Sequence, residues 1–473
     1  MILQRFFHDG LAQASYLVGC GATGEAVVVD PNRDAAAYVA AARSQNLRIT
    51  HVTETHIHAD YLSGLRELCA ATGAQAYLSN EGGADWQYAS AAADKAVLLS
   101  DGDTFMVGNI RFEAVHTPGH TPEHLTFLVT DTAGADRPVG AFTGDFIFAG
   151  DVGRPDLLEK AAGVAGTMEA GAGQLYASIQ RFKTQPDYLQ LWPGHGAGSA
   201  CGKSLGAMPQ TTLGYERLFN WALADMTESA FIRAVLDGQS DPPTYFAQMK
   251  RLNRAGPHVL NGMPAPAMMP SHELEAVLDS GALVVDTRPW PDYAAAHVRG
   301  TISIPLNRSF VSWAGWLLPY DADVYLVTKD AMAAQAAVRE LALIGIDRVA
   351  GVFTADAVSN ARADRIGTID QTDVRGMSAA AAERGNTILD VRNAQEWQAG
   401  HVPVNGGAMV LHIPLGQLQR RIAEVPRGER VLVHCKGGTR SAIAASILER
   451  NGIDAENVKG GFDAWLAAGL GTD

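Results

Sequence analysis

Cysteine is scarce in this chain of 473 residues. Four cysteines, at positions 20, 69, 201 and 435, form no C-x-x-C pair and do not reach the density of a disulfide scaffold. Their spacing therefore excludes a small secreted domain held together by disulfides. We expect reduced thiols and a cytoplasmic location.

Positive charge and long apolar runs are also lacking. Lys and Arg number 37 against 51 Asp and Glu, which gives a net charge of −14 and argues against a nucleic-acid surface or an anionic membrane as partner. No stretch of 18 apolar residues occurs, and charged residues interrupt the apolar runs at the start of the chain. We predict no nucleic-acid partner, no membrane span and no signal peptide.

The length and an internal repeat predict several domains. A chain of this size usually holds two to four domains. Strand-like runs fill the first 200 residues, helical spacing follows over 211–254, and a proline-rich segment begins at residue 255. Beyond it, the stretch 283–306 is paralleled by 388–415. We predict domains over residues 1–258, 259–365 and 366–473.

The second copy of the repeat carries a candidate catalytic cysteine. The strand "RVLVH" runs directly into "CKGGTRSA", so Cys435 lies at a strand-to-helix turn, where backbone N–H groups and positive charge stabilise a thiolate. An inert buried cysteine is the alternative. We predict two catalytic residues and four that bind substrate: Cys435 and Arg440, and Lys436, Gly437, Gly438 and Thr439.

This motif resembles the rhodanese family of sulfurtransferases. "DVRNAQEWQAGHV" is followed by a C-x-x-G-x-R-S loop, in which four residues separate Cys435 from Arg440; the related loop of tyrosine phosphatases has five. The resemblance implies that Cys435 accepts a sulfane sulfur as a persulfide and passes it to an acceptor. The first copy has Thr328 at the matching position and lacks the loop glycines and arginine. It resembles an inactive rhodanese-homology domain, with a packing or docking role.

Histidines and aspartates recur in a fixed order in the first 200 residues. The stretches "THIHAD", "HTPGHTPEH", "AFTGD" and "LWPGH" each end or follow a strand-like run. Any one of these histidines alone is more often structural than a ligand, but the joint order resembles the metallo-β-lactamase superfamily over roughly residues 1–210. The resemblance implies a metal at one sheet edge. We predict an α/β fold, with an αββα metallo-β-lactamase sandwich followed by two α/β rhodanese-like domains.

The loop "THIHADY" favours one metal. Dinuclear zinc members of the superfamily have a histidine where this chain has Tyr61, and a neutral phenol is a poor zinc ligand. A mononuclear set of His56, His120 and Asp145 would combine two histidines with one carboxylate. Such a set, with open positions, suits non-haem Fe(II) that binds O₂ and substrate together.

The loop is similar to that of persulfide dioxygenases, which reads T-H-x-H-A-D, and "GDVGRPD" matches their G-R-x-D signature. The resemblance implies one Fe²⁺ per chain, bound by His56, His120 and Asp145. It implies a supporting role for His58, Asp60, Tyr61 and His195, with direct ligation by His58 left open. Arg154 binds a substrate carboxylate or thiolate in one interpretation and forms a surface ion pair in the other.

Both halves of the chain thus resemble proteins that handle sulfane sulfur. We predict a persulfide dioxygenase that oxidises low-molecular-weight persulfides with O₂ to sulfite and thiol, coupled to a rhodanese that forms thiosulfate, in sulfide detoxification. Small-molecule persulfide, O₂ and sulfite are the expected partners, and a homo-oligomer is expected. The carrier thiol stays open between glutathione, coenzyme A, bacillithiol and an inorganic polysulfide.

Two alternatives remain. One is a mononuclear or dinuclear zinc thioester hydrolase of the glyoxalase II type, fused to a sulfurtransferase or sulfur-carrier module. The other is a non-enzymatic role for the rhodanese pair, as a carrier or docking module for another protein. Metal content separates the first from the dioxygenase, because two zinc ions favour hydrolysis and one iron favours oxygenation.

Overall fold

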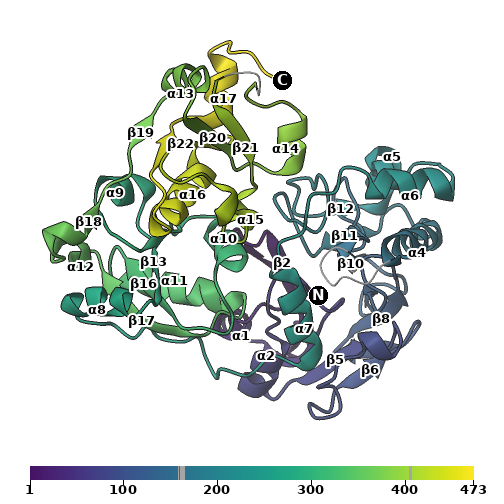
Figure 1. Cartoon of the computed structure of the whole chain (residues 1–473). Coiled ribbons are helices and arrows are strands. Elements are labelled where there is room, and N and C mark those ends of the chain that lie inside the picture. Colours follow the sequence, from purple (N-terminus) through teal and green to yellow (C-terminus); the bar gives the residue numbers. More distant parts are fainter. Residues whose placement is uncertain (158, 160–165, 404–406) are drawn as a thin grey trace. The chain divides into compact units, whose positions relative to one another are not determined.

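The chain forms two compact units. The computed structural model describes residues 1–157, 159, 166–403 and 407–473. Unit 1 comprises Met1–Pro264 with Ala342–Gly345, and unit 2 comprises Ala265–Leu341 with Ile346–Asp473. Figure 1 labels the elements of both units. Among the described residues, no helix has the length and apolar character needed to cross a membrane.

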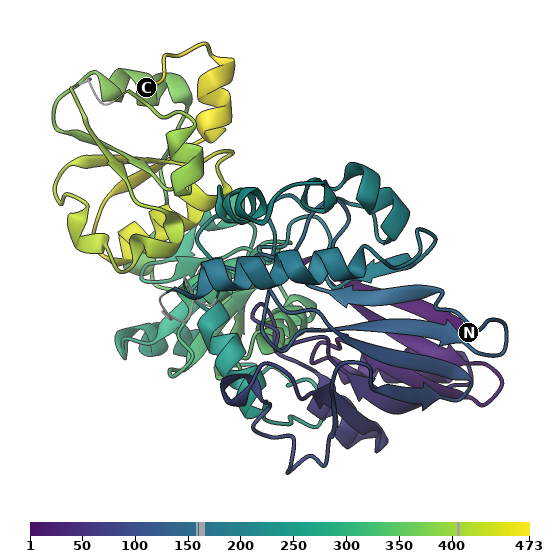
Figure 2. The ribbon, with the colours of Figure 1, turned by 90° about the vertical axis from the view of Figure 1, so that its right-hand side faces the viewer.

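Unit 1 contains two six-stranded sheets that stack face to face, drawn in purple and blue in Figure 2. The first sheet has the order β1-β2-β3-β4-β5-β6, and its strands are Ile2–His8, Gln13–Cys20, Glu25–Val29, Arg48–Thr53, Gln75–Ser79 and Val97–Leu99. The second has the order β12-β11-β10-β9-β8-β7. In chain order, its strands β7 to β12 are Thr104–Val107, Ile110–His116, Leu125–Asp131, Gly140–Gly144, Gln190–Pro193 and Thr211–Thr212.

Helices cover the outer face of each sheet. Helices α1 (Ala35–Ser44) and α2 (Leu65–Thr72) pack on the first sheet in one apolar cluster with its outward-facing side chains. Helices α4 (Thr167–Phe182) and α6 (Glu228–Leu236) do the same for the second sheet. The result is a four-layer αββα sandwich, which confirms the predicted fold of this part of the chain.

Alternating side chains build the core between the sheets. Along β8, Ile110, Phe112 and Ala114 are fully buried, whereas the residues between them are only partly buried. This period of two directs one row of side chains into the sandwich. The Phe112 ring lies between those of Phe105 and Phe142, at centroid distances of 5.0 and 6.1 Å. The core fixes the sheets, and the loops that follow β4, β10 and β11 carry His56, Asp145 and His195.

Unit 2 contains two sheets whose strands run parallel within each sheet, one for each copy of the repeat. One has the order β15-β13-β16-β17 and the other β19-β23-β22-β20-β21. The strands of the first, β13, β15, β16 and β17, are Leu283–Asp286, Ile302–Ser303, Val324–Thr328 and Val349–Thr354. Those of the second, β19 to β23, are Gln371–Thr372, Asn386–Asp390, Met409–His412, Arg430–His434 and Ala455–Val458. This confirms two rhodanese-like α/β domains.

The two copies of the repeat pack on one another within unit 2. Helix α16 (Thr439–Arg450) of the second copy lies against β15 of the first, where the Ser446 hydroxyl accepts a hydrogen bond of 2.9 Å from the Ser303 N–H. Glu449, near the end of α16, contacts the His297 ring of the first copy at 2.6 Å. The predicted limits of 258 and 365 for these domains stay a prediction.

Replacing Phe112 with Ala should destabilise unit 1. The substitution leaves a cavity between the sheets, and we expect the free energy of unfolding to fall by about 3–5 kcal/mol. Hydrogen exchange of unit 1 peptides is the suitable measurement, because a chain of two units need not unfold in one transition. The matched control is Phe219→Ala, since Phe219 is 69% exposed; its cost should stay below about 1 kcal/mol. Equal effects of the two substitutions would contradict this account of the core.

Candidate metal centre and sulfur-transfer loop

The three predicted metal ligands lie together at one edge of the sandwich. One potential ligand atom from each of His56, His120 and Asp145 lies within 4.8 Å of the others, and all three residues are buried. The Asp145 Oδ2 atom is 3.4 Å from Nε2 of His120 and 3.8 Å from Nε2 of His56. The structure thus brings together residues that are 89 positions apart in the sequence.

These residues fit the metal that the fold implies. Both carboxylate oxygens of Asp145 are buried, with no hydrogen-bond partner among the described residues. The His120 ring donates from Nδ1 to the Arg154 carbonyl oxygen at 2.9 Å, which leaves the Nε2 lone pair directed toward Asp145. Burial lowers the pKa of His56 and His120, so both imidazoles are favoured in the neutral form that ligates metals. A buried charge without a partner is costly, and a cation here removes that cost.

His195 lies directly beside this group. Its Nε2 atom is 3.4 Å from Asp145 Oδ1 and 3.3 Å from Asp60 Oδ2, while its Nδ1–H donates to the Ala12 carbonyl oxygen at 3.0 Å. Asp60, His195 and Cys201 form a second group whose potential ligand atoms lie within 4.8 Å of one another. Cys201 was not among the predicted site residues, because no motif marks it apart from its position shortly after "PGH".

His58 and Tyr61 both turn toward Asp30. The His58 Nε2 atom contacts Asp30 Oδ1 at 3.1 Å; burial opposes a charge on this ring, but the Asp30 carboxylate raises its pKa to about 9. The Tyr61 hydroxyl donates to the Asp30 carbonyl oxygen at 3.1 Å, and burial raises its pKa well above the usual value, so the phenol stays neutral. In this arrangement, the atom through which His58 could still ligate a metal is Nδ1, which has no hydrogen-bond partner among the described residues.

Two further residues that the sequence analysis missed hold this loop. Asp30, directly after β3, accepts hydrogen bonds from the Thr55 N–H and hydroxyl at 2.7 and 3.0 Å. Asn253, in helix α7 (Phe246–Ala255), donates to the carbonyl oxygens of His58 and Tyr61, both at 2.8 Å. Asp30 follows the strand-like run "AVVVD", and this position at a strand end could have marked it as a site residue. Nothing in the sequence marks Asn253, because only the fold places its helix on the loop.

Arg154 lies neither in a surface ion pair nor with its guanidinium free to bind substrate. The side chain is buried, with 0% exposure, and donates two hydrogen bonds to Asp156 at 2.6 and 2.7 Å. It also donates to the carbonyl oxygens of Ala200 and Ser240 at 3.2 and 2.7 Å. The ion pair is therefore an internal one that joins loops beside the metal centre. Substrate binding by Arg154 would require these bonds to open.

The Cys435 loop in unit 2 surrounds the sulfur with donors. Cys435 follows β22 and is 1% exposed, and its Sγ atom accepts a hydrogen bond of 3.0 Å from the Gly438 N–H. The Ser441 hydroxyl lies 3.5 Å from the same sulfur. Gly438 has a φ of 105°, a conformation that side chains rarely adopt, and it is the residue before helix α16. This geometry can stabilise a thiolate or a persulfide anion.

The Arg440 side chain forms an ion pair with Glu396, and no hydrogen bond to the Cys435 sulfur is found among the described residues. Its guanidinium donates two hydrogen bonds to the Glu396 carboxylate, at 2.6 and 2.7 Å. Glu396 also closes a capping box with Asn393 at the start of α14 (Ala394–Gln398). Lys436 is exposed to solvent. In the first copy, the residue that matches Cys435 is Thr328, which has no thiol. Its hydroxyl donates to the Asp330 carbonyl oxygen at 3.1 Å.

Substitutions should separate metal ligands from supporting residues. We expect Asp145→Asn to lose most bound metal, because the centre then lacks its only negative ligand. His58→Gln should lower metal affinity by about 10–100-fold while still allowing one equivalent to bind, as is typical when a supporting hydrogen bond is lost. Elemental analysis and competition with a chelator provide the measurement. Asp136→Asn, at an exposed position, is the control and should bind metal normally. Complete metal loss in His58→Gln would show that His58 is a ligand.

Comparisons with known proteins cover both halves of the chain. Residues 8–195 match the metallo-beta-lactamase superfamily, and residues 271–353 and 372–468 match the rhodanese-like domain. The chain is 30% identical over 202 residues to "Persulfide dioxygenase ETHE1, mitochondrial" of Bos taurus, an alignment that covers 41% of this chain and 68% of that one. It is 31% identical over 180 residues to a hydroxyacylglutathione hydrolase of Rhodospirillum rubrum, which covers 38% of this chain and 60% of the hydrolase.

A solved structure extends the likeness beyond the sandwich. The crystal structure of a metallo-beta-lactamase from Staphylococcus aureus is 43% identical, with a TM-score of 0.69, and the match covers 75% of this chain and 99% of that one. That share is larger than the sandwich alone and reaches into the rhodanese-like region. The chain therefore belongs to the metallo-beta-lactamase superfamily, as a member in which two rhodanese-like domains follow the metallo-beta-lactamase domain.

Proposed function

We propose that the protein is an iron-dependent persulfide dioxygenase and sulfurtransferase. The observation that carries this proposal is the donor set of His56, His120 and Asp145, with the Tyr61 hydroxyl turned away to Asp30. Two imidazoles and one carboxylate leave open positions for O₂ and a substrate sulfur. Similarity to a mammalian persulfide dioxygenase and the rhodanese-like domains support the same assignment.

The proposed oxidation balances without a further reductant. A persulfide R–S–SH, O₂ and water give R–SH, sulfite and two protons, so the terminal sulfur is oxidised and O₂ is reduced. Bound Fe(II) would supply the activation of O₂. The chain supplies the site: Asp145, His56 and His120 hold the metal, and the bond from His120 to the Arg154 carbonyl oxygen fixes the ring orientation. Asp30 and Asn253 hold the loop that carries His56 and His58.

The proposed transfer at Cys435 also balances. The thiolate attacks the outer sulfur of R–S–SH, the S–S bond breaks, and R–SH leaves with the proton while Cys435 becomes a persulfide anion. Sulfite then attacks the outer sulfur, which gives thiosulfate and restores the thiolate. The Gly438 N–H is placed to stabilise negative charge on the Cys435 sulfur during both steps. The sulfite made in one unit is thus the acceptor used in the other.

A zinc thioester hydrolase is the second candidate, and two observations favour it. The chain is as similar to a hydroxyacylglutathione hydrolase as to the persulfide dioxygenase. The group of Asp60, His195 and Cys201 offers donors next to the first group. Against it, Tyr61 stands where a dinuclear centre would need an imidazole, and its hydroxyl is engaged with Asp30.

Variants at the two centres should separate the two activities. We expect Cys435→Ser to abolish thiosulfate formation while O₂ uptake with glutathione persulfide continues at its normal rate, because the metal centre lies in the other unit. Asp145→Asn should abolish O₂ uptake, and sulfur transfer to added sulfite should continue. An oxygen electrode and a thiosulfate assay on the same preparations give both readouts. Loss of both activities in either variant would contradict two independent centres.

A further inference from the structure

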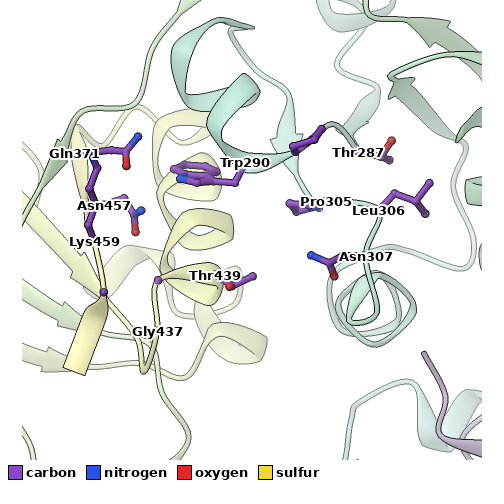
Figure 3. Close-up of a pocket in the computed structure, with 13 residues that line it drawn as sticks. Thr287, Trp290, Pro305, Leu306, Asn307, Gln371, Gly437, Thr439, Asn457 and Lys459 are labelled. Carbon is purple, nitrogen blue, oxygen red and sulfur yellow. The ribbon is translucent and has the colours of Figure 1, made fainter. Parts of the chain in front are cut away.

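The metal ligands are held differently from the sulfur-transfer loop. In unit 2, Gly437, Gly438 and Thr439 of that loop line a cavity of about 450 Å³, which Figure 3 shows in close-up. In unit 1, the ligand side chains are buried, and hydrogen bonds from neighbouring segments fix the loops that carry them. One short segment, Glu123–Leu125, contacts the loops of two ligands.

Glu123 and Leu125 hold the loop around His56 from both sides. The buried Glu123 carboxylate accepts a hydrogen bond of 2.8 Å from the N–H of Ile57, directly after His56. The Leu125 N–H donates to the carbonyl oxygen of Thr55, directly before His56, at 2.7 Å. The backbone on each side of this ligand is therefore bonded to one segment at the start of β9.

His124, between these two residues, holds the backbone of Asp145. Its Nε2 atom accepts a hydrogen bond of 3.2 Å from the Asp145 N–H. A backbone N–H can only donate, so Nε2 carries the lone pair and Nδ1 carries the proton. Nδ1 donates to the Thr117 hydroxyl at 2.8 Å, and Thr117 shares a further hydrogen bond of 2.9 Å with the Thr126 hydroxyl. These bonds fix the tautomer of His124 and direct its acceptor atom toward Asp145.

The same imidazole packs against the ring of His56. The two ring centroids are 5.1 Å apart, the planes differ by 28°, and both side chains are buried. A Cβ atom at Gly144 would lie only 2.8 Å from the His124 Nε2 atom, so the glycine before Asp145 leaves room for this contact. Because both nitrogens of His124 are engaged, the residue supports two ligands without acting as a ligand itself.

We propose that His124 is a positioning residue of the metal centre, which sets the separation of His56 and Asp145. The third histidine of "HTPGHTPEH" thereby belongs to the site although it binds no metal. Groups that orient the ligands of a metal contribute to its affinity nearly as much as some ligands do. The inference rests on the metal centre alone and is independent of which metal is bound and which reaction follows.

Metal binding by the full chain tests this role. The probe is Co²⁺, whose absorption bands report the geometry of its ligands, and a competing chelator gives the affinity. We expect His124→Leu, which leaves the Asp145 N–H without an acceptor, to weaken Co²⁺ binding about 10- to 100-fold and to shift the bands. His124→Gln supplies an amide oxygen as acceptor and should recover most of the affinity and the wild-type bands.

A second variant leaves the imidazole in place. Thr117→Val keeps the shape of the side chain but removes the hydroxyl that accepts from Nδ1 of His124. It should weaken Co²⁺ binding in the same direction, by about 3- to 10-fold. The matched control is His51→Leu, which removes an imidazole from β4 of the same unit, where the ring stacks on those of Tyr77 and Phe105. This control should leave the Co²⁺ affinity and bands unchanged.

Two results would overturn the inference. One is an equal loss of affinity in His124→Leu and His124→Gln, which would show that the acceptor atom is immaterial. The other is wild-type affinity and bands in both His124→Leu and Thr117→Val. The expected differences in Co²⁺ binding, together with no O₂ uptake by the iron-loaded wild-type chain, would support the inference and refute the proposed dioxygenase, so the two failures are distinguishable.

Discussion

Burial of the Asp145 carboxylate is the constraint on which the metal centre depends. The side chain is fully buried, and neither oxygen has a hydrogen-bond partner among the described residues. Three imidazoles, of His56, His120 and His195, lie within 3.8 Å of these oxygens, so the charge is balanced only if a cation or a proton joins the group. The surrounding bonds, from Asp30 to the loop and from His120 to a backbone carbonyl, all serve to keep this arrangement in place.

The two units supply chemically complementary sites. In the proposed function, the metal centre would oxidise a sulfane sulfur and the Cys435 loop would carry one as an anion. Sulfite links them, since it is the product of the first proposed reaction and the acceptor in the second.

The order of the histidine and aspartate motifs predicted the four-layer sandwich, and the repeat predicted the pair of α/β domains, through their resemblance to known families. The same resemblance implied the group of His56, His120 and Asp145, which the fold brings together at one sheet edge. What the sequence could not show depends on side-chain direction. Arg154 turns inward to Asp156, Arg440 pairs with Glu396, and Asn253 reaches the metal loop from a distant helix.

Reconstitution of metal-free protein with iron or zinc distinguishes a mononuclear iron dioxygenase from a dinuclear zinc hydrolase. Preparations loaded to graded extents are assayed for O₂ uptake with glutathione persulfide and for hydrolysis of a glutathione thioester. We predict that O₂ uptake rises in proportion to iron and saturates at one iron per chain, with one sulfite formed per O₂, and that zinc supports no uptake. Thioester hydrolysis that saturates at two zinc ions per chain, with no O₂ uptake by the iron-loaded protein, would instead identify the protein as a zinc hydrolase.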